Sequence, residues 1–319
     1  MLGENGGPGG LSHALRNIPI ILDIARDMEK LCPGAWLVNF TNPESRICRA
    51  VNKYSTVKTV GLCHGIFMGL DNVSYITGIP ADDLEAVASG INHFTWMHKL
   101  TRKSTGEDAY PLLSEKNKSF NPKYMPFSRY LYEKIGLFPS PSDDHVGEYF
   151  AYAHEMAGEH GYDFAAADMF WEGLWDTIKK MASGEEDVKG LLSSKSGEIA
   201  FEIIEDMLAD RKRFRLSVNI PNKNFVKGVP DDAVVEVPCT VDAKGIHGMT
   251  CEPLPEPVVA MCAHQTHIQE LCVDAAVKGS RKLALEALLI DPVIHSAAAA
   301  EKILDEFLSV HKEFLPQFK

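Results

Sequence analysis

The stretch Ala35–Gly65, AWLVNFTNPESRICRAVNKYSTVKTVGLCHG, decides the fold. Ala35–Phe40 is a short apolar run that predicts a strand, and Asn42-Pro43 marks a turn directly after it. Ser45–Asn52 predicts a helix that leads to a second apolar run, Val57–Leu62. A strand, a helix and a second strand at this spacing predict a right-handed crossover between parallel strands, as in α/β proteins.

Ligands of open α/β sheets bind at the carboxyl ends of the strands. Asn42 and Cys63 both fall at such ends, so the sequence predicts a ligand site at this edge of the sheet. Upstream, the residues after Gly9-Gly10 have helical periodicity up to Cys32-Pro33-Gly34, with Pro19 either kinking this helix or marking its start. By default, the glycine-rich opening before it is a flexible loop.

The remainder of the chain predicts a second region of mixed α+β type. Leu84–Thr101 suggests extended segments interrupted by Asn92-His93, and the chain becomes largely helical after Glu107. We therefore expect one domain over residues 1–90 and another over residues 91–319. Within the second, the patterns predict helices over Phe164–Met181, Ser196–Leu208 and Pro257–Lys278 and a strand over Val234–Val241.

Composition narrows the class of partner. The 319 residues are 45% hydrophobic and 24% charged, a globular balance, and carry a net charge of −12. An acidic chain of this kind argues against nucleic acid and against an anionic membrane surface, and favours a small-molecule partner. Seven scattered cysteines favour a reducing cytoplasm over a disulfide framework, and no run reaches the roughly 20 apolar residues of a membrane span.

Cys63 and His93 are ligand types that suit a borderline divalent metal with open positions for substrate. The alternative is a buried structural cysteine and a capping histidine. His64, beside Cys63, could orient a substrate hydroxyl or donate to it, or could simply be a polar residue at a strand end.

Asp143-Asp144-His145, followed by Glu148-Tyr149, is a dense cluster of residues able to transfer protons. A well-capped acidic first turn of a helix is the simpler explanation for it, and the sequence alone favours that explanation.

Five segments in order resemble the NAD- and manganese-dependent glycoside hydrolase family 4. Three further segments downstream look like the carboxyl-terminal part of that family, so the resemblance covers nearly the whole chain. The segments are Glu4–Gly10, Ala14–Pro19, Asn39–Pro43, Gly61–Gly65, Gly90–His93, Asp231–Pro238, Gly245–His247 and Ala284–Pro292. The resemblance implies a Rossmann-like parallel sheet, incomplete at its start, followed by a largely helical domain. It also implies a homo-oligomer, dimer or tetramer.

The resemblance further implies hydrolysis of α-glycosides by redox-assisted elimination in place of the two-carboxylate scheme. In that scheme NAD takes hydride from sugar C3, a base removes the C2 proton, the aglycone leaves from C1, water adds, and the hydride returns. Cys63 and His93 would hold Mn2+ or another divalent ion on the C2 and C3 oxygens. Asn42 would bind sugar hydroxyls and, with Glu4, contact the cofactor.

The base expected from the resemblance is Asp143, with Asp144 next, and with His145 and Tyr149 as supporting site residues. Gly65 after Cys63-His64 resembles the α-glucuronidase and α-galacturonidase group. A C6 carboxylate also needs a cation, for which Arg46 is the candidate, although a solvated helix face is the simpler expectation for Arg46 and for Arg49.

Two other functions stay open. Family members begin with a strand and a glycine-rich turn that bind NAD, and nothing of this kind precedes Glu4. A non-catalytic remnant of the family is therefore one alternative. The other is a 2-hydroxyacid dehydrogenase, because Thr41-Asn42-Pro43 after a strand also resembles the lactate and malate enzymes.

Overall fold

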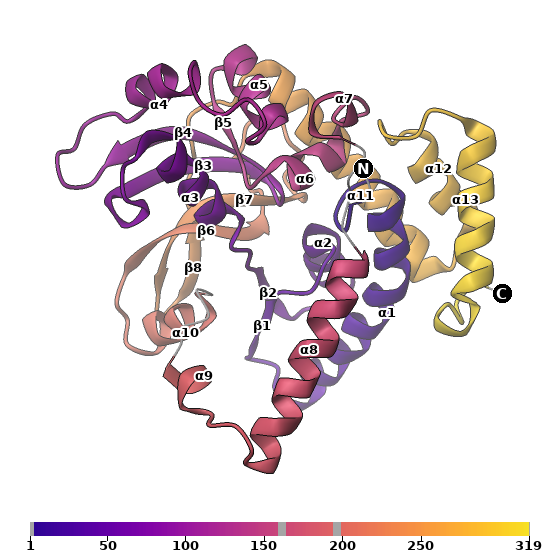
Figure 1. Cartoon of the computed structure of the whole chain (residues 1–319). Helices are drawn as coiled ribbons and strands as arrows, with labels where there is room; N and C mark the ends of the chain where they lie inside the picture. The colour runs from indigo at the N-terminus through magenta and orange to yellow at the C-terminus, as the bar shows by residue number, and fades with distance from the viewer. Residues whose placement is uncertain (1–2, 159–163, 194–198, 319) are drawn as a thin grey trace.

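The computed structural model describes residues 3–158, 164–193 and 199–318, and these form an eight-stranded mixed sheet with helices around it (Figure 1). The strands follow the order β1-β2-β6-β7-β3-β4-β5, and β8 pairs with β7 off this path. Their bounds are β1 Trp36–Asn39, β2 Lys58–Gly61, β3 Leu84–Ile91, β4 Phe94–Arg102, β5 Phe138–Ser140, β6 Arg213–Pro221, β7 Val234–Asp242 and β8 Gly245–Gly248.

The parallel part of the sheet is the pair β1 and β2, joined in register from Trp36↔Lys58 to Asn39↔Gly61. All other pairings are antiparallel. The two parts meet between β2 and β6, where one residue pair, Gly61↔Asn219, is in register. The parallel crossover predicted from the sequence is therefore confirmed, and the β3–β4 hairpin turns at Asn92-His93 as expected.

Helices form layers on the sheet and beside it. α1, α2, α11, α12 and α13 pack together, and Figure 1 shows α1, α11, α12 and α13 on one side of the molecule. α3, α4 and α5 cover the β3–β4–β5 end. The helix bounds are α1 Gly7–Leu31, α2 Glu44–Tyr54, α3 Gly65–Thr77, α4 Tyr110–Asn117, α5 Pro126–Ile135, α6 Asp143–Val146, α7 His154–Ala157, α8 Phe164–Ser183, α9 Lys189–Ser193, α10 Ala200–Leu208, α11 Glu256–Lys278, α12 Arg281–Leu289 and α13 Ala297–Val310.

Three apolar clusters stabilise this arrangement. The first lies on the central strands and includes Trp96 and Val237, the second joins the layer of α1, α11 and α12 around Leu15, and the third packs α3 on β3 and β4 around Val73. Burial of such side chains contributes about 1.5–3 kcal/mol each. The sheet edge that carries Asn42 and Cys63 is therefore set by packing on several sides.

The long predicted elements agree with the structure, with some corrections. Pro19 lies inside α1, and α1 begins at Gly7, so the glycines expected in a flexible loop form its first turn. α10 begins at Ala200, and residues 196–198 of the predicted helix lie outside the described residues. The division of the chain near residue 90 stays a prediction. No helix among the described residues is long and apolar enough to cross a bilayer.

Candidate active site

A cavity of about 130 Å3 opens where the parallel strands end. Asn42 follows β1, and Cys63 follows β2, so parallel pairing brings both to the same edge. His93 reaches the cavity from the β3–β4 turn. The lining residues are Glu4, Phe40, Asn42, Leu62, Cys63, His64, Gly65, Met68, His93, Pro141 and His145. The sequence prediction that Asn42, Cys63 and His93 lie together therefore agrees with the geometry.

The Cys63 thiol lies in a low-dielectric position. Burial, with added repulsion from the carboxylate of Glu236, raises the pKa of Cys63 to about 12. The Gly65 amide, 3.4 Å from Sγ, opposes this shift only in part. Without a cation the group is a neutral thiol at pH 7, whereas a divalent ion beside it would favour the thiolate.

His93 occupies the turn in a left-handed conformation, with φ of 62°, which is uncommon for a residue with a side chain. Its imidazole is buried, and Asn5 Nδ2 lies 3.1 Å from Nδ1. Asn5 also holds the start of α2, because its Oδ1 accepts from the Glu44 amide at 2.9 Å. The turn therefore aims the ring into the cavity at some cost in backbone strain.

Glu148 fixes the opening segment of the chain beneath this ring. It is buried, and its Oε2 accepts from the amides of Asn5 at 2.9 Å and Gly6 at 2.6 Å. Its Oε1 lies 3.6 Å from His93 Nδ1. Burial opposes ionisation, but His93, His145 and the Gly6 amide together lower the pKa of Glu148 below its usual range. A single carboxylate thus positions both the Glu4 segment and His93.

Glu4, His93 and His145 each offer a donor atom within 4.8 Å of the others. Cys63 lines the same cavity, so carboxylate, imidazole and thiol donors surround one space. Such a mixed set fits a borderline divalent ion with open coordination positions. Asn42 is held against Glu4, because its Nδ2 donates to Glu4 Oε1 at 2.8 Å.

His145 and Asp144 form a pair at the cavity wall. His145 Nδ1 lies 3.1 Å from Asp144 Oδ1, and the His145 ring meets His93 edge to face with centroids 4.2 Å apart. Burial alone would lower the pKa of His145, but its bond to Asp144 and the charges of Asp144, Glu148 and Glu4 raise it. Conversely, burial would raise the pKa of Asp144, and the bond with His145 lowers it well below its usual range.

Besides Asp144, three residues expected at the site do not line the cavity. Asp143 accepts from the amides of Phe127 at 3.0 Å and Ser128 at 2.7 Å, so both of its oxygens cap the start of α5. Tyr149 is buried and donates to the Asn92 carbonyl at 2.9 Å. Burial raises the pKa of its phenol well above the usual value.

Arg46, the third of these residues, is 1% exposed, which contradicts the solvated helix face expected for it. Its guanidinium packs against the first turn of α1, where a Cβ on Gly10 would lie 2.0 Å from Nη1. Arg49 is also buried, and it pairs with Asp232 and Glu270. The periodicity of α2 could not reveal this, because its basic side chains meet α1 and α11.

His64 and Gly65 begin α3 at the cavity rim. His64 is exposed at the N-cap position, and Gly65 is buried. A Cβ on Gly65 would make ordinary contacts of 3.5 Å with Cys63 Sγ and Pro141, so packing alone does not demand glycine there. A side chain at this position would narrow the cavity.

Asn5 and Glu148 are site residues that no local sequence pattern indicates. Only their neighbours in the sequence point to them. Asn5 lies in the opening glycine-rich segment, and Glu148 lies close to the Asp143-Asp144-His145 cluster. A bond between residues 143 apart cannot be inferred from local pattern. Taken together, fold and site define an α/β protein in which thiol, imidazole and carboxylate donors line one cavity at the ends of two parallel strands.

Comparisons with known proteins make the class specific. The model of the family 4 glycosyl hydrolases matches residues 1–78, and the model of the family 4 glycosyl hydrolase C-terminal domain matches residues 88–294. An α-glucosidase from Erwinia rhapontici is 30% identical, over 99% of this chain and 76% of that protein. An α-galacturonidase from Thermoanaerobacter italicus is 27% identical, over 98% of this chain and 75% of that protein. The chain therefore belongs to glycosyl hydrolase family 4.

Solved structures agree with this assignment. The 6-phospho-β-glucosidase of Thermotoga maritima with NAD and glucose-6-phosphate has a TM-score of 0.78 at 25% identity, over 98% of this chain and 74% of that one. A crystal of that enzyme with manganese as well has a TM-score of 0.81 at 24% identity. The expected family, fold class and glycosidase activity class are thereby confirmed, which sets aside the dehydrogenase alternative.

Proposed function

We propose that this family 4 glycosidase hydrolyses α-D-galacturonides or α-D-glucuronides with the help of NAD and a divalent metal ion, manganese being the candidate. The observation that carries the proposal is the convergence of Cys63, from the end of β2, and His93, from the β3–β4 turn, on one cavity. Glu4 adds a further donor to the same space, and His145 lies beside them.

The donor set supports the metal part of this proposal. We assign Cys63 and His93 as ligands, with Glu4 within reach and Glu148 holding His93 from behind. A cavity of about 130 Å3 is small for a dinucleotide, so its residues fit only the reacting end of NAD, with Glu4 and Asn42 as contacts. When bound, NAD supplies a reversible hydride acceptor and the ion supplies a Lewis acid.

The chain's own residues then orient the sugar and move its proton. Asn42 presents its amide to substrate hydroxyls from the end of β1, and His64 lies at the rim near an incoming hydroxyl. We place the base at His145, with Asp144 as its partner, because His145 lines the cavity. Asp143, expected as the base from the sequence, already binds two amides of α5.

The preference for a uronide rests on Gly65 and on what surrounds it. Gly65 leaves room at the cavity wall, and α-galacturonidases are among the relatives. Arg46 is buried away from the cavity, so it does not suit the C6 carboxylate. His64 and the first turn of α3 are better placed to receive an anion.

We also infer a homo-oligomer in the cytoplasm. Five large apolar side chains of α8 are exposed, which supports a contact between copies of this chain. They are Met169, Phe170, Trp171, Trp175 and Ile178. Cytoplasmic location rests on the absence of a disulfide among the seven free cysteines.

The test is turnover of aryl α-galacturonide and α-glucuronide with Mn2+, NAD and reductant. We expect Cys63→Ser to abolish turnover, whereas Cys32→Ser, at an exposed cysteine at the end of α1, should retain it. Turnover undiminished after thorough chelation would contradict the metal role. Faster cleavage of aryl α-galactoside would contradict the uronide preference alone. No turnover of any glycoside by a chain that binds Mn2+ would favour the non-catalytic alternative.

A further inference from the structure

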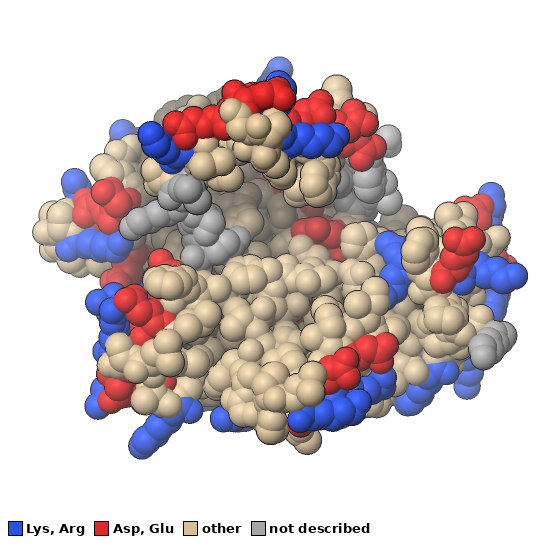
Figure 2. Space-filling view, turned by 90° about the horizontal axis from the view of Figure 1, so that it is seen from below, with Lys and Arg blue, Asp and Glu red and all other residues tan. Residues whose placement is uncertain are grey.

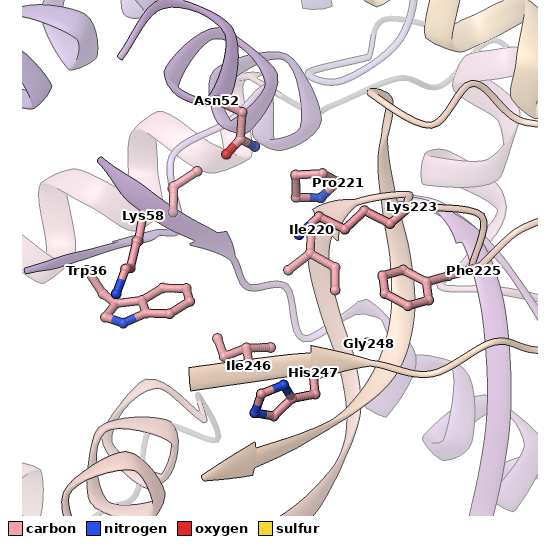
Figure 3. Close-up of a pocket in the computed structure, with 11 residues that line it drawn as sticks. Trp36, Asn52, Lys58, Ile220, Pro221, Lys223, Phe225, Ile246, His247 and Gly248 are labelled. Atoms are coloured by element: carbon pink, nitrogen blue, oxygen red, sulfur yellow. The ribbon is translucent and has the colours of Figure 1, made fainter. Parts of the chain in front are cut away.

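A second cavity, of about 430 Å3, lies at the opposite ends of the same two strands (Figure 3). Trp36 and Lys58 are the first residues of β1 and β2, whereas Asn42 and Cys63 follow their last residues. The strands therefore separate this cavity from the candidate active site. It is lined by Trp36, Asn52, Lys58, Thr59, Ile220, Pro221, Lys223, Phe225, Ile246, His247 and Gly248.

The lining is cationic in a strongly acidic protein. Lys58, Lys223 and His247 face this space, and no aspartate or glutamate lines it, although the whole chain carries a net charge of −12. Within the described part of the chain neither lysine forms an ion pair. His247 is oriented by Asp242, whose Oδ1 lies 2.8 Å from Nε2. The cavity therefore offers unpaired positive charge to an anion.

Aromatic and apolar side chains form the rest of the lining, apart from Asn52 and Thr59. Lys58 Nζ lies 5.8 Å from the centre of the Trp36 ring, so charge and aromatic surface are presented side by side. The rings of Phe225 and Pro221 and the side chain of Ile220 border the opposite side, and the Asn52 amide lies at the rim (Figure 3). A volume of this size and lining is typical of a small-molecule site.

The loop that presents Lys223 is held rigidly in an uncommon conformation. Lys223 and Asn224 have φ of 41° and 64°, the left-handed region that residues with side chains rarely adopt. Buried Asn222 fixes the loop, donating to the carbonyls of Val226 at 3.0 Å and Val229 at 2.8 Å. Strain held in this way is characteristic of ligand-binding segments.

Gly248 keeps the cavity open from β8. A Cβ there would lie 2.6 Å from Ile220 Cδ1 and 2.6 Å from the Phe225 ring. Any larger residue would therefore push these walls apart or fill the space between them.

We propose that this cavity is a second binding site for a small anion that carries a sugar ring, such as a sugar acid or a sugar phosphate. Lys58 and Lys223 bind the anionic group, and Trp36 and Phe225 contact the ring face. The proposal does not depend on the reaction at the first cavity, because no residue lines both.

The test uses the full chain carrying Cys63→Ser, in metal-free buffer, so that binding at the candidate active site is suppressed. Isothermal titration with D-galacturonate and with glucose 6-phosphate should show binding to one site. Lys58→Gln and Lys223→Gln should each weaken it about tenfold, the loss of one charge-assisted contact. Lys99→Gln, at an exposed position on β4, is the matched control and should leave it unchanged. Gly248→Val should block binding.

Binding of one anion but not the other would support the site and identify the anionic group. Absence of binding for both up to about 10 mM, which is far weaker than a specific small-molecule site, would overturn the proposal. Equal affinity for neutral galactose, or binding unaffected by both lysine changes, would also overturn it. Activity of the enzyme on glycosides is not part of this readout, so failure of the proposed function is recognised separately.

Discussion

Glu148 is a single residue that organises the donor set without lining the cavity. Its two oxygens face the Asn5 and Gly6 amides on one side and His93 on the other. We expect Glu148→Gln to weaken Mn2+ binding about tenfold, because a partner behind a ligating histidine fixes the orientation of its ring. Isothermal titration with Mn2+ measures this, with Glu155→Gln as the exposed control. Unchanged affinity in a folded variant would show that the backbone and Asn5 position His93 without Glu148.

Glu44 is a buried carboxyl that should make stability depend on pH. Burial raises its pKa to about 8, the nearby charge of Glu236 adds to the shift, and a bond from Cys48 opposes it. At pH values between the ordinary pKa of a glutamate and about 8, Glu44 is protonated in the folded protein and ionised in the unfolded chain. The free energy of unfolding therefore falls as the pH rises through this range. From pH 5 to pH 8 the loss is on the order of 4 kcal/mol.

Glu44→Gln should remove most of that dependence and raise the free energy of unfolding at pH 8 above that of the parent chain. Urea unfolding at the two pH values measures the difference, and Glu115→Gln on exposed α4 serves as the control. A variant whose stability still falls by the original amount would place the titrating group elsewhere, Glu236 being the next candidate.

At the scale of one element, Asp143 acts on α5. Removal of its side chain leaves the Phe127 and Ser128 amides without their cap. We expect Asp143→Ala to lower the free energy of unfolding by about 1–2 kcal/mol. Asp144→Ala should cost less, because its side chain is 60% exposed. Denaturant titration of both variants gives the comparison.

Turnover by variants of Asp143 and His145 separates helix capping from catalysis. Turnover by folded Asp143→Ala should stay within about tenfold of the parent, whereas His145→Gln should lose the roughly 100-fold or more typical of a missing general base. If Asp143→Ala lost its turnover and His145→Gln retained it, Asp143 would be the base.

Elements with a strong local signal were predictable, and long-range pairings were not. The period of the apolar residues indicated β1, α2 and β2, and parallel pairing then placed Asn42 and Cys63 together. Nothing local distinguishes Asp143 as the cap of a helix that precedes it by 15 residues, or Arg46 as buried against Gly10. Such contacts depend on how the layers pack. The periodicity of the sequence could therefore predict residues that line the cavity, but not the residues that hold them in position.

At the scale of the whole molecule, the surface is uneven. Seen from below, it presents a broad face with few charged side chains (Figure 2). On α8, Trp171 and Trp175 lie one turn apart and are 52% and 60% exposed. Exposed apolar surface of this extent is unusual for a monomer.

We expect Trp171→Glu combined with Trp175→Glu to dissociate an oligomer into monomers, because a charge cannot be buried unpaired in a contact between copies. Light scattering after size-exclusion chromatography measures the mass. Lys179→Glu, on the same helix, should leave the mass unchanged. A parent chain that is already monomeric at micromolar concentration would contradict the homo-oligomer.

The narrow junction at Gly61↔Asn219 has a mechanical consequence. Cys63 belongs to the parallel part of the sheet and His93 to the antiparallel part. One ion bound by both residues would therefore link the two parts across the β2–β6 junction. Separation of β2 from β6 would then require the loss of a metal ligand. We therefore expect amide hydrogen exchange at β2 and β6 to slow on addition of Mn2+. Exchange that is indifferent to the ion would mean that the two sides already move as one body.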